Sequence, residues 1–207
     1  GSAYVACTAI VAPLGTAAIA ANTFAVTAEG LCYMPGYGIE LAAATLVGQA
    51  LGAGRGELAR RLGWMVVLLG MAVMTLGGAL LYLLAPLVIG TMTADPEIRS
   101  LSVEVLRVEL LAEPLYGAYI VAAGVFRGAG DTLFSSLMAL ASMWGVRLPL
   151  AAFLASRRGL RGVWLAMCVE LCGRGTIFLA RLAGPRWQRR GLATATAGSE
   201  GSGGARD

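Results

Sequence analysis

Acidic residues inside otherwise apolar stretches are the strongest candidates for chemistry in this sequence. Glu40, Glu113 and Glu170 each interrupt such a stretch. Burying an ionised carboxylate is costly unless a partner neutralises it, so each of these residues needs a physical reason. A carboxylate in apolar surroundings can take up a proton or help to coordinate Na⁺, and either event offsets its charge. We therefore examined these residues first as cation-binding groups.

Glu113 has the most informative neighbours of the three. Pro114 follows it and frees a backbone carbonyl from helical hydrogen bonding, an arrangement that can coordinate Na⁺ or protons. Glu109 lies one helical turn earlier on the same face, and Tyr116 follows three positions later. The residue types and their spacing make Glu113, Glu40, Glu109 and Tyr116 the candidates for coupling to a cation.

Structural interpretations of the same residues stay open. Glu113 can also be a carboxylate that reaches the outer headgroups, or one that pairs with Arg107. Glu40 can make a fixed hydrogen bond to a neighbouring helix, with Gly36 and Gly38 allowing close approach.

Other ionisable and sulfur-containing residues point to structural roles. Glu170 and Arg174 are four residues apart, which predicts an ion pair on one helix face. Glu29 is expected at the outer surface in contact with solvent. Cys168 and Cys172 share a helix face, but two thiols without a further ligand do not make a zinc site. We expect no metal site.

The missing residue types exclude several function classes. The sequence contains no His, and all sixteen of its basic residues are Arg, so it has no Lys. Schiff-base lysines, Ser-His triads and His-ligated zinc are therefore impossible within this chain. Gly124, Gly128 and Gly130 lack the preceding strand and the Lys of a P-loop. The arginines lie in short groups between apolar runs, which does not favour nucleic-acid binding. We expect neither an enzyme nor a cofactor other than H⁺ or Na⁺.

The overall composition indicates a membrane protein. Apolar residues make up 57% of the chain and charged residues 14%, and the mean hydropathy is +0.73. Soluble domains are about 45–50% apolar and about 25% charged. Because crossing a bilayer core takes about 20 apolar helical residues, the apolar runs predict five membrane helices. Their expected ranges are 15–51, 62–92, 101–126, 132–155 and 161–183.

Turn and cap residues mark the ends of these helices. Pro35 should bend or break the first one, so one bent crossing and two half-helices are both allowed. Asp95 is a cap followed by Pro96, so the third helix can start earlier than 101. Residues 1–13 supply only about 16 Å of apolar helix or less, which predicts a partial membrane helix. The Gly- and Ser-rich residues 188–207 are expected to be a disordered tail.

Counting back from an arginine at one end of each helix estimates how deep the carboxylates lie. Glu40 precedes Arg55 by 15 residues, about 22 Å along a helix. Glu113 precedes Arg127 by 14 residues, about 21 Å. Glu170 precedes Arg181 by 11 residues, about 17 Å. The sequence thus predicts that three helices bring a carboxylate to nearly the same height.

The arginines also predict how the chain is oriented. Because positive residues concentrate in cytoplasmic loops, the end with more arginines should face the cytoplasm, together with the C-terminus. We expect a multi-pass protein of the cytoplasmic, or inner, membrane. The richer end would carry Arg55, Arg60, Arg61, Arg127, Arg181, Arg186, Arg189, Arg190 and Arg206, and the other end Arg99, Arg157, Arg158 and Arg161.

Several short motifs, in this order and spacing, resemble the C-terminal half of transporters of the multidrug and toxic compound extrusion (MATE) family. The resemblance extends from about Leu14 to Trp187. It is supported by the stretches 14–21, 42–54, 126–132, 147–150 and 162–164. Within the motif loops the distinctive residues are Gly48, Gln49, Gly52, Gly54, Arg127, Gly128, Gly130 and Asp131.

The resemblance implies a fold and a function. It implies an all-α, polytopic membrane helix bundle, one lobe of a twelve-helix transporter, with about five full transmembrane helices plus the N-terminal partial helix. Residues 14–187 would form this C-terminal lobe. Its partners would be the lipid bilayer, the missing N-terminal lobe of the same transporter, and small amphipathic or cationic drugs. Extrusion would be driven by H⁺ or Na⁺. Where some family members carry an acidic cation-binding residue, this sequence has Tyr116.

Two alternatives remain. A lipid-linked saccharide flippase of related architecture would need cationic side chains for a pyrophosphate, and only Arg107, Arg147 and Arg174 lie within the expected helices. The chain could instead be a transport-incompetent fragment or an accessory membrane subunit.

Overall fold

Helices account for almost all of the structure, a computed structural model that describes residues 8–185, 187 and 188. No strand occurs among these residues. The expected tail, residues 188–207, and the start of the expected partial helix lie almost entirely outside the described part. The helices are η1 Ala12–Leu14, α2 Thr16–Gly52, α3 Gly56–Met92, α4 Pro96–Leu110, α5 Glu113–Gly128, α6 Thr132–Ser142, η2 Met143–Arg147, α7 Leu148–Arg158 and α8 Leu160–Ala183.

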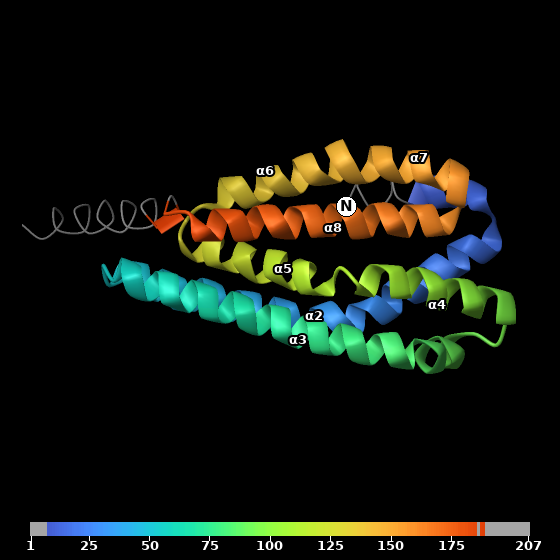
Figure 1. The fold of residues 1–207 in the computed structure, drawn as a ribbon, viewed down its shortest axis with the longest axis horizontal. Helices are drawn as coiled ribbons and strands as arrows, with labels where there is room; N and C mark the ends of the chain where they lie inside the picture. Colours follow the sequence, from blue (N-terminus) through green and yellow to red (C-terminus); the bar gives the residue numbers. More distant parts are fainter. Residues whose placement is uncertain (1–7, 186, 189–207) are drawn as a thin grey trace, which may run out of the picture.

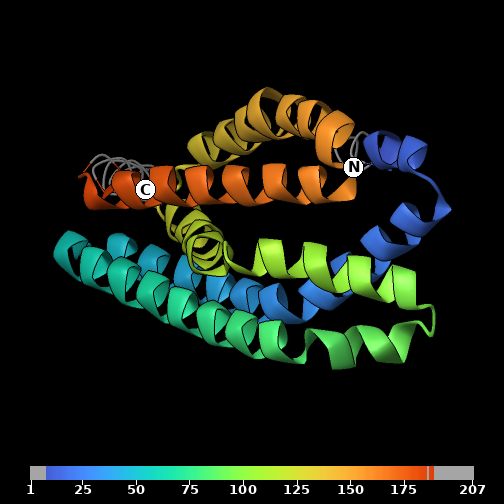
Figure 2. The ribbon, with the colours of Figure 1, turned by 45° about the vertical axis from the view of Figure 1, so that its right-hand side comes forward.

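The helices lie along one long axis and alternate in direction (Figure 1). The segments α2, α4–α5 and α8 run one way, whereas α3 and the continuous segment α6–η2–α7 run the other way. Figure 2 shows α6–α7 and α8 on one side of the bundle and α2 and α3 on the opposite side. Two apolar cores hold the bundle together, one toward each end.

The described helices fit a multi-pass membrane protein. Three segments are long and apolar enough to cross a membrane, and a bent pair, α4 with α5, makes a fourth. These single segments are Gly56–Met92, Thr132–Arg158 and Leu160–Ala183. Leu68, Leu76, Leu83 and Leu87 of α3 are more than half exposed, as a lipid-facing surface would be. The helix α2 is absent from this set although it has 37 residues.

The first expected helix is continuous. Residues 16–52 form one helix that passes through Pro35, so two separate half-helices are excluded. The expected start of the third helix is confirmed, since Asp95 accepts hydrogen bonds from the backbone N–H groups of Glu97 and Ile98. Its expected continuity over 101–126 is wrong. The helix breaks after Leu110 and resumes at Glu113 with a bend of 59°.

Pro114 explains the position of this break. It has no N–H to donate to the carbonyl of Leu110, and it disfavours helical geometry at Glu113. The local chain instead closes tightly, with the Ala112 N–H donating to the Glu109 carbonyl at 2.7 Å. The bend therefore falls between two acidic residues, Glu109 and Glu113.

Glycines of α5 let its backbone contact that of α2. A Cβ added at Gly124 would overlap the carbonyl oxygen of Glu40, and one at Gly128 would overlap that of Ala44. Close approach of this kind is how small residues join membrane helices. The contacts fix the register of α2 against α5.

This contact predicts opposite effects for two matched substitutions. Gly124→Ala should lower the free energy of unfolding by about 1–3 kcal/mol, because backbone atoms of α2 must move away. Gly38→Ala, with nothing within 4 Å of its added Cβ, should leave the stability unchanged or raise it by up to about 1 kcal/mol. Chemical unfolding of both purified variants in mixed micelles measures the difference. Equal effects would argue against the α2–α5 contact.

Candidate cation and ligand site

Two fully buried carboxyl groups flank the bend between α4 and α5. Glu109 and Glu113 have no exposed surface, and none of their four carboxyl oxygens has a hydrogen-bond partner among the described residues. Glu113 packs against α3, where a Cβ added at Gly78 would lie 2.9 Å from its Cγ. The alternative that Glu113 pairs with Arg107 is wrong, because the Arg107 guanidinium stacks on the Tyr82 ring instead of pairing with Glu113.

A third carboxyl group belongs to the same region. Glu29 of α2 is 6% exposed, so the expectation of a solvated surface residue is wrong. It lies within electrostatic reach of Glu109, Glu113 and Arg147. Counting along a helix predicts its depth but not the side it presents, and the packing of α2 against α4 turns Glu29 inward.

Glu29 also lines an internal cavity of about 380 Å³ between α2, α5, η2–α7 and α8. Four tyrosines form much of its wall, and their rings contact one another in a row. Tyr33 and Tyr116 have ring centroids 6.3 Å apart, and Tyr116 stacks on Tyr119 at 6.2 Å. The polar and aromatic lining consists of Thr8, Asn22, Glu29, Tyr33, Tyr37, Tyr116, Tyr119, Arg147, Trp164 and Arg174.

Arg147 reaches this cavity from a π-helical turn, Met143–Arg147. Because Pro149 cannot donate to the carbonyl of Gly145, the regular α-helical pattern cannot continue through this point. The sequence indicates Arg147 as a possible pyrophosphate ligand and as part of the motif stretch 147–150, but it does not connect Arg147 with Glu29. The pair Arg147–Pro149 was the available signal.

The structure separates Glu40 from the other carboxylates. Glu40 contacts α5 at Gly124, eleven residues beyond Glu113 and thus about 16 Å further along the helix. Its carboxylate accepts a hydrogen bond from Arg127 at 2.6 Å. The prediction of one common height is therefore wrong for Glu40, and its partner is an arginine on the neighbouring helix.

The ends of neighbouring helices lie at different heights. Counting residues back from an arginine at each helix end therefore misjudged the relative depth of Glu40. Ala44 of α2 contacts Gly128 at the end of α5, but α2 continues to Gly52, about 12 Å further. Arg55 and Arg127 consequently mark different depths. Glu113 and Glu170 do lie within about one turn in height, since Gly175 of α8 contacts Leu115 of α5.

Glu170 and Arg174 form a buried ion pair, 2.8 Å apart, as their spacing predicts. Ser142 of α6 donates a hydrogen bond to the same carboxylate, so the pair also connects α6 with α8. Arg174 lies over the ring of Tyr119, 4.3 Å from its centroid. In the described part of the chain, no three His, Cys, Asp or Glu side chains are grouped closely enough to hold a metal ion.

Comparison with known proteins decides the family. The MatE family model matches residues 2–153, most of the chain. The chain belongs to the MatE family.

Curated relatives of this MatE chain are longer. A probable multidrug resistance protein NorM of Brucella suis is 34% identical over 195 residues, covering 91% of this chain and 40% of the relative. A protein of the same name from Thermotoga maritima is 29% identical over 185 residues, covering 87% of this chain and 39% of the relative. The chain thus spans about two fifths of the length of these relatives.

Solved structures show the same fold. The Vibrio cholerae MATE transporter VcmN in the bent form matches with a TM-score of 0.81 at 17% identity, covering 94% of this chain and 43% of that one. The MATE transporter ClbM in complex with Rb⁺ matches with a TM-score of 0.85 at 21% identity, covering 93% and 46%. The bundle is therefore part of a MATE fold.

The residues singled out in the MatE motif loops hold helix ends in place. Gly54 and Gly130 adopt left-handed conformations just after α2 and α5. Gln49 accepts the Ala53 N–H through its backbone carbonyl, and Gly48 approaches the backbone of Gly128, whereas nothing lies near Gly52.

Asp131, the last residue of the second motif loop, is buried and pairs with Arg181 of α8. The Arg181 guanidinium lies 3.8 Å from the ring centroid of Phe134 and 5.8 Å from that of Phe126. The loop between α5 and α6 is thereby fastened to the end of α8.

Removing one member of the buried pair should be severe. Glu170→Gln should destabilise the protein by about 3–5 kcal/mol, because it leaves the Arg174 charge without its counter-ion. The double change Glu170→Gln with Arg174→Gln should recover part of this loss. Unfolding in mixed micelles measures the free energy of unfolding of the wild-type protein, the single variant and the double variant.

Glu57→Gln serves as the matched control. Glu57 forms an exposed pair with Arg61 at the same sequence spacing, and its loss should cost at most about 1 kcal/mol. A Glu170→Gln protein as stable as this control would show that the buried pair is unimportant.

Proposed function

We propose that this chain forms one lobe of a multidrug efflux transporter that exchanges a drug for H⁺ or Na⁺ and is not an enzyme. Family membership and the names of the multidrug resistance relatives support drug efflux. One observation carries the cation coupling. Glu109 and Glu113 are fully buried on either side of a helix bend, and their carboxyl oxygens have no partner.

The proposed coupling follows from the cost of charge in this position. An ionised carboxylate without a partner costs several kcal/mol in a membrane interior, and Glu109 and Glu113 repel each other when both are ionised. A proton or Na⁺ bound between α4 and α5 offsets that cost. Because the bend separates Glu109 from Glu113, cation uptake favours one angle between the two helices and cation release favours another.

The tyrosine-lined cavity is the proposed drug-contact surface of this lobe. Aromatic faces attract organic cations and bury apolar rings, so the row of tyrosines suits an amphipathic drug. Glu29 lines the cavity together with Arg147, whose positive charge opposes that of Glu29. Tyr116 lines the cavity and lies three residues from Glu113, so cation binding at Glu113 and drug binding can influence each other.

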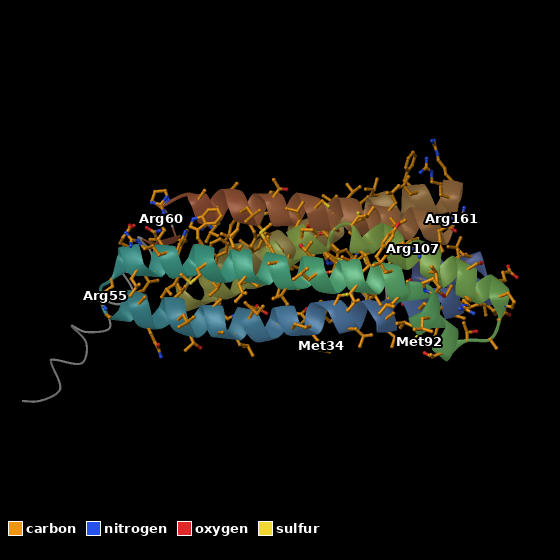
Figure 3. The ribbon with its side chains drawn as sticks, turned by 60° about the horizontal axis from the view of Figure 1, so that its bottom comes forward. Met34, Arg55, Arg60, Met92, Arg107 and Arg161 are labelled. Carbon is orange, nitrogen blue, oxygen red and sulfur yellow. The ribbon has the colours of Figure 1, made fainter. Side chains whose placement is uncertain are left out.

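We further propose that the lobe works with a second lobe of the same transporter in the inner membrane, with the C-terminus in the cytoplasm. Arg55 and Arg60 lie at one end of the bundle, and Arg107 and Arg161 at the other (Figure 3). The arginine-rich end would face the cytoplasm. Of the arginines in this count, Arg186, Arg189, Arg190 and Arg206 lie outside the described residues.

The saccharide flippase finds less support than drug efflux. Of the three arginines considered for a pyrophosphate, Arg107 lies outside the cavity, and Arg174 is already paired with Glu170. Only Arg147 would remain in the cavity for the ligand. A transport-incompetent fragment or accessory subunit predicts no gradient-driven efflux at all, so the experiment below separates it from a transporter.

Substitution of the buried carboxyls tests the proposal. In the natural gene product that contains this chain, Glu113→Gln should reduce gradient-driven dye efflux by about tenfold or more, and Glu109→Gln should reduce it similarly. The amide keeps the size of the side chain but cannot exchange a cation. Efflux from proteoliposomes under separate H⁺ and Na⁺ gradients gives the rates and identifies the driving ion.

Glu97→Gln is the control, because Glu97 lies in the exposed first turn of the same helix, α4. It should keep its efflux and its expression level. Normal efflux by the Glu113→Gln and Glu109→Gln proteins would remove both residues from the coupling mechanism.

A further inference from the structure

A groove on the outside of the bundle combines two arginines with an apolar wall. It lies between α3 and α4 and has a volume of about 630 Å³. Arg99 and Arg107 of α4 line it, together with Tyr82 and Pro86 of α3. A second, almost wholly apolar hollow of about 400 Å³ lies beside it and shares Tyr82 and Leu111 with its lining.

Pro86 explains why Arg107 is held on α3. It has no N–H to donate to the carbonyl of Tyr82, and the Nε–H of Arg107 donates to that carbonyl at 3.2 Å. The Arg107 guanidinium also lies over the Tyr82 ring, 4.9 Å from its centroid. Arg99 donates to the Pro86 carbonyl at 2.7 Å and lies against Gly90. Both guanidiniums are therefore fixed in position.

Most of their hydrogen-bonding capacity remains available. An arginine has five N–H donors, and the contact to α3 uses one or two of them. Among the described residues, neither Arg99 nor Arg107 has a carboxylate within 4.0 Å. The one acidic residue of the groove, Glu104, pairs with Arg161 at 2.6 Å. The groove thus carries a net positive charge.

The groove and the apolar hollow together are about as long as one leaflet of a bilayer is thick. The two carbonyls that hold the arginines are four residues apart, so the guanidiniums are anchored about 6 Å apart along α3. From Pro86 the lining of α3 continues to Thr75, a distance of about 16 Å. Half of a hydrocarbon core is about 15 Å thick. Arg107 lies toward the end of the bundle that also holds Met92 and Arg161 (Figure 3).

We propose that this groove binds one anionic phospholipid. Its phosphate accepts hydrogen bonds from Arg99 and Arg107 at the membrane surface, and one acyl chain follows the apolar hollow past Leu83 and Leu111 toward Pro114. A bound lipid would cover the outside of the α4–α5 bend. The proposal rests on the groove alone and is independent of drug transport.

Lipid retention by the full chain tests the proposal. Native mass spectrometry after reconstitution with phosphatidylglycerol and phosphatidylcholine should find one phosphatidylglycerol held by the wild-type protein. The double change Arg99→Gln with Arg107→Gln should lower its retention about tenfold, since charge-assisted hydrogen bonds are lost. Glutamine keeps a donor for the Tyr82 carbonyl. Ala79→Trp, which fills the apolar hollow, should lower retention without changing any charge.

The control removes the same charge elsewhere. Arg55→Gln with Arg60→Gln, at the end of the bundle opposite Arg107 (Figure 3), should leave retention within about twofold, because the charges lost lie outside the groove. An equal loss in this control would overturn the proposal, as would equal retention of phosphatidylcholine. Displacement of the lipid by an excess of inorganic phosphate would also overturn it, because that result describes a free-anion site. Circular dichroism checks that each variant is folded.

Discussion

The cost of charge in a bundle surrounded by lipid constrains this structure more than any other factor. Arg174 is paired with Glu170, Arg127 with Glu40, and Arg181 with Asp131 while it lies over aromatic rings. The Arg127 and Arg181 pairs join different segments, and Ser142 of α6 bonds to the Glu170 carboxylate, so the neutralisation of charge also sets how the segments pack. Glu109 and Glu113 depart from this pattern, because their carboxyl oxygens have no protein partner. Groups left in this condition are where a mobile cation has the largest effect on the energy of the bundle.

Prolines determine where the helices of the bundle are irregular, and each irregular point lies beside a polar or charged group of a candidate site. Pro114 breaks the helix between the two unpartnered carboxyls, and Pro149 follows the π-helical turn that carries Arg147 to the cavity. Pro86 leaves a carbonyl that Arg107 satisfies. In each case a missing backbone N–H frees a carbonyl, and a polar or charged group lies nearby. The internal site and the outer groove consequently lie on opposite sides of the same bent segment, α4–α5. A ligand in the internal site and a ligand in the outer groove would therefore both contact α4–α5. Each could affect the angle between α4 and α5.

Much of the fold could be predicted from local signals. The apolar runs, the Asp95 cap and the glycine turns gave the ends of the helices within six residues, except near Pro114, where one continuous helix was expected and the helix breaks. The site was predicted less completely. Glu113 and Tyr116 share α5, and Glu170 pairs with Arg174 on α8, because neighbours within one helix are fixed by its geometry. Glu109 belongs to α4, and its place beside Glu113 depends on the bend. Glu29 and Arg147 were not predicted as members of the site, and Glu40 was predicted at the height of Glu113, which is wrong.

Sequence alone thus determined that this protein folds in a membrane. It also determined the number and extent of the long helices and the family resemblance. These properties depend on composition and on interactions between residues close in the chain. Only the tertiary structure decided which carboxylates meet. Heights depend on how far each helix overhangs its neighbour, and here α2 extends about 12 Å beyond α5. The side that Glu29 presents depends on the packing of α2 against α4, two segments far apart in the chain.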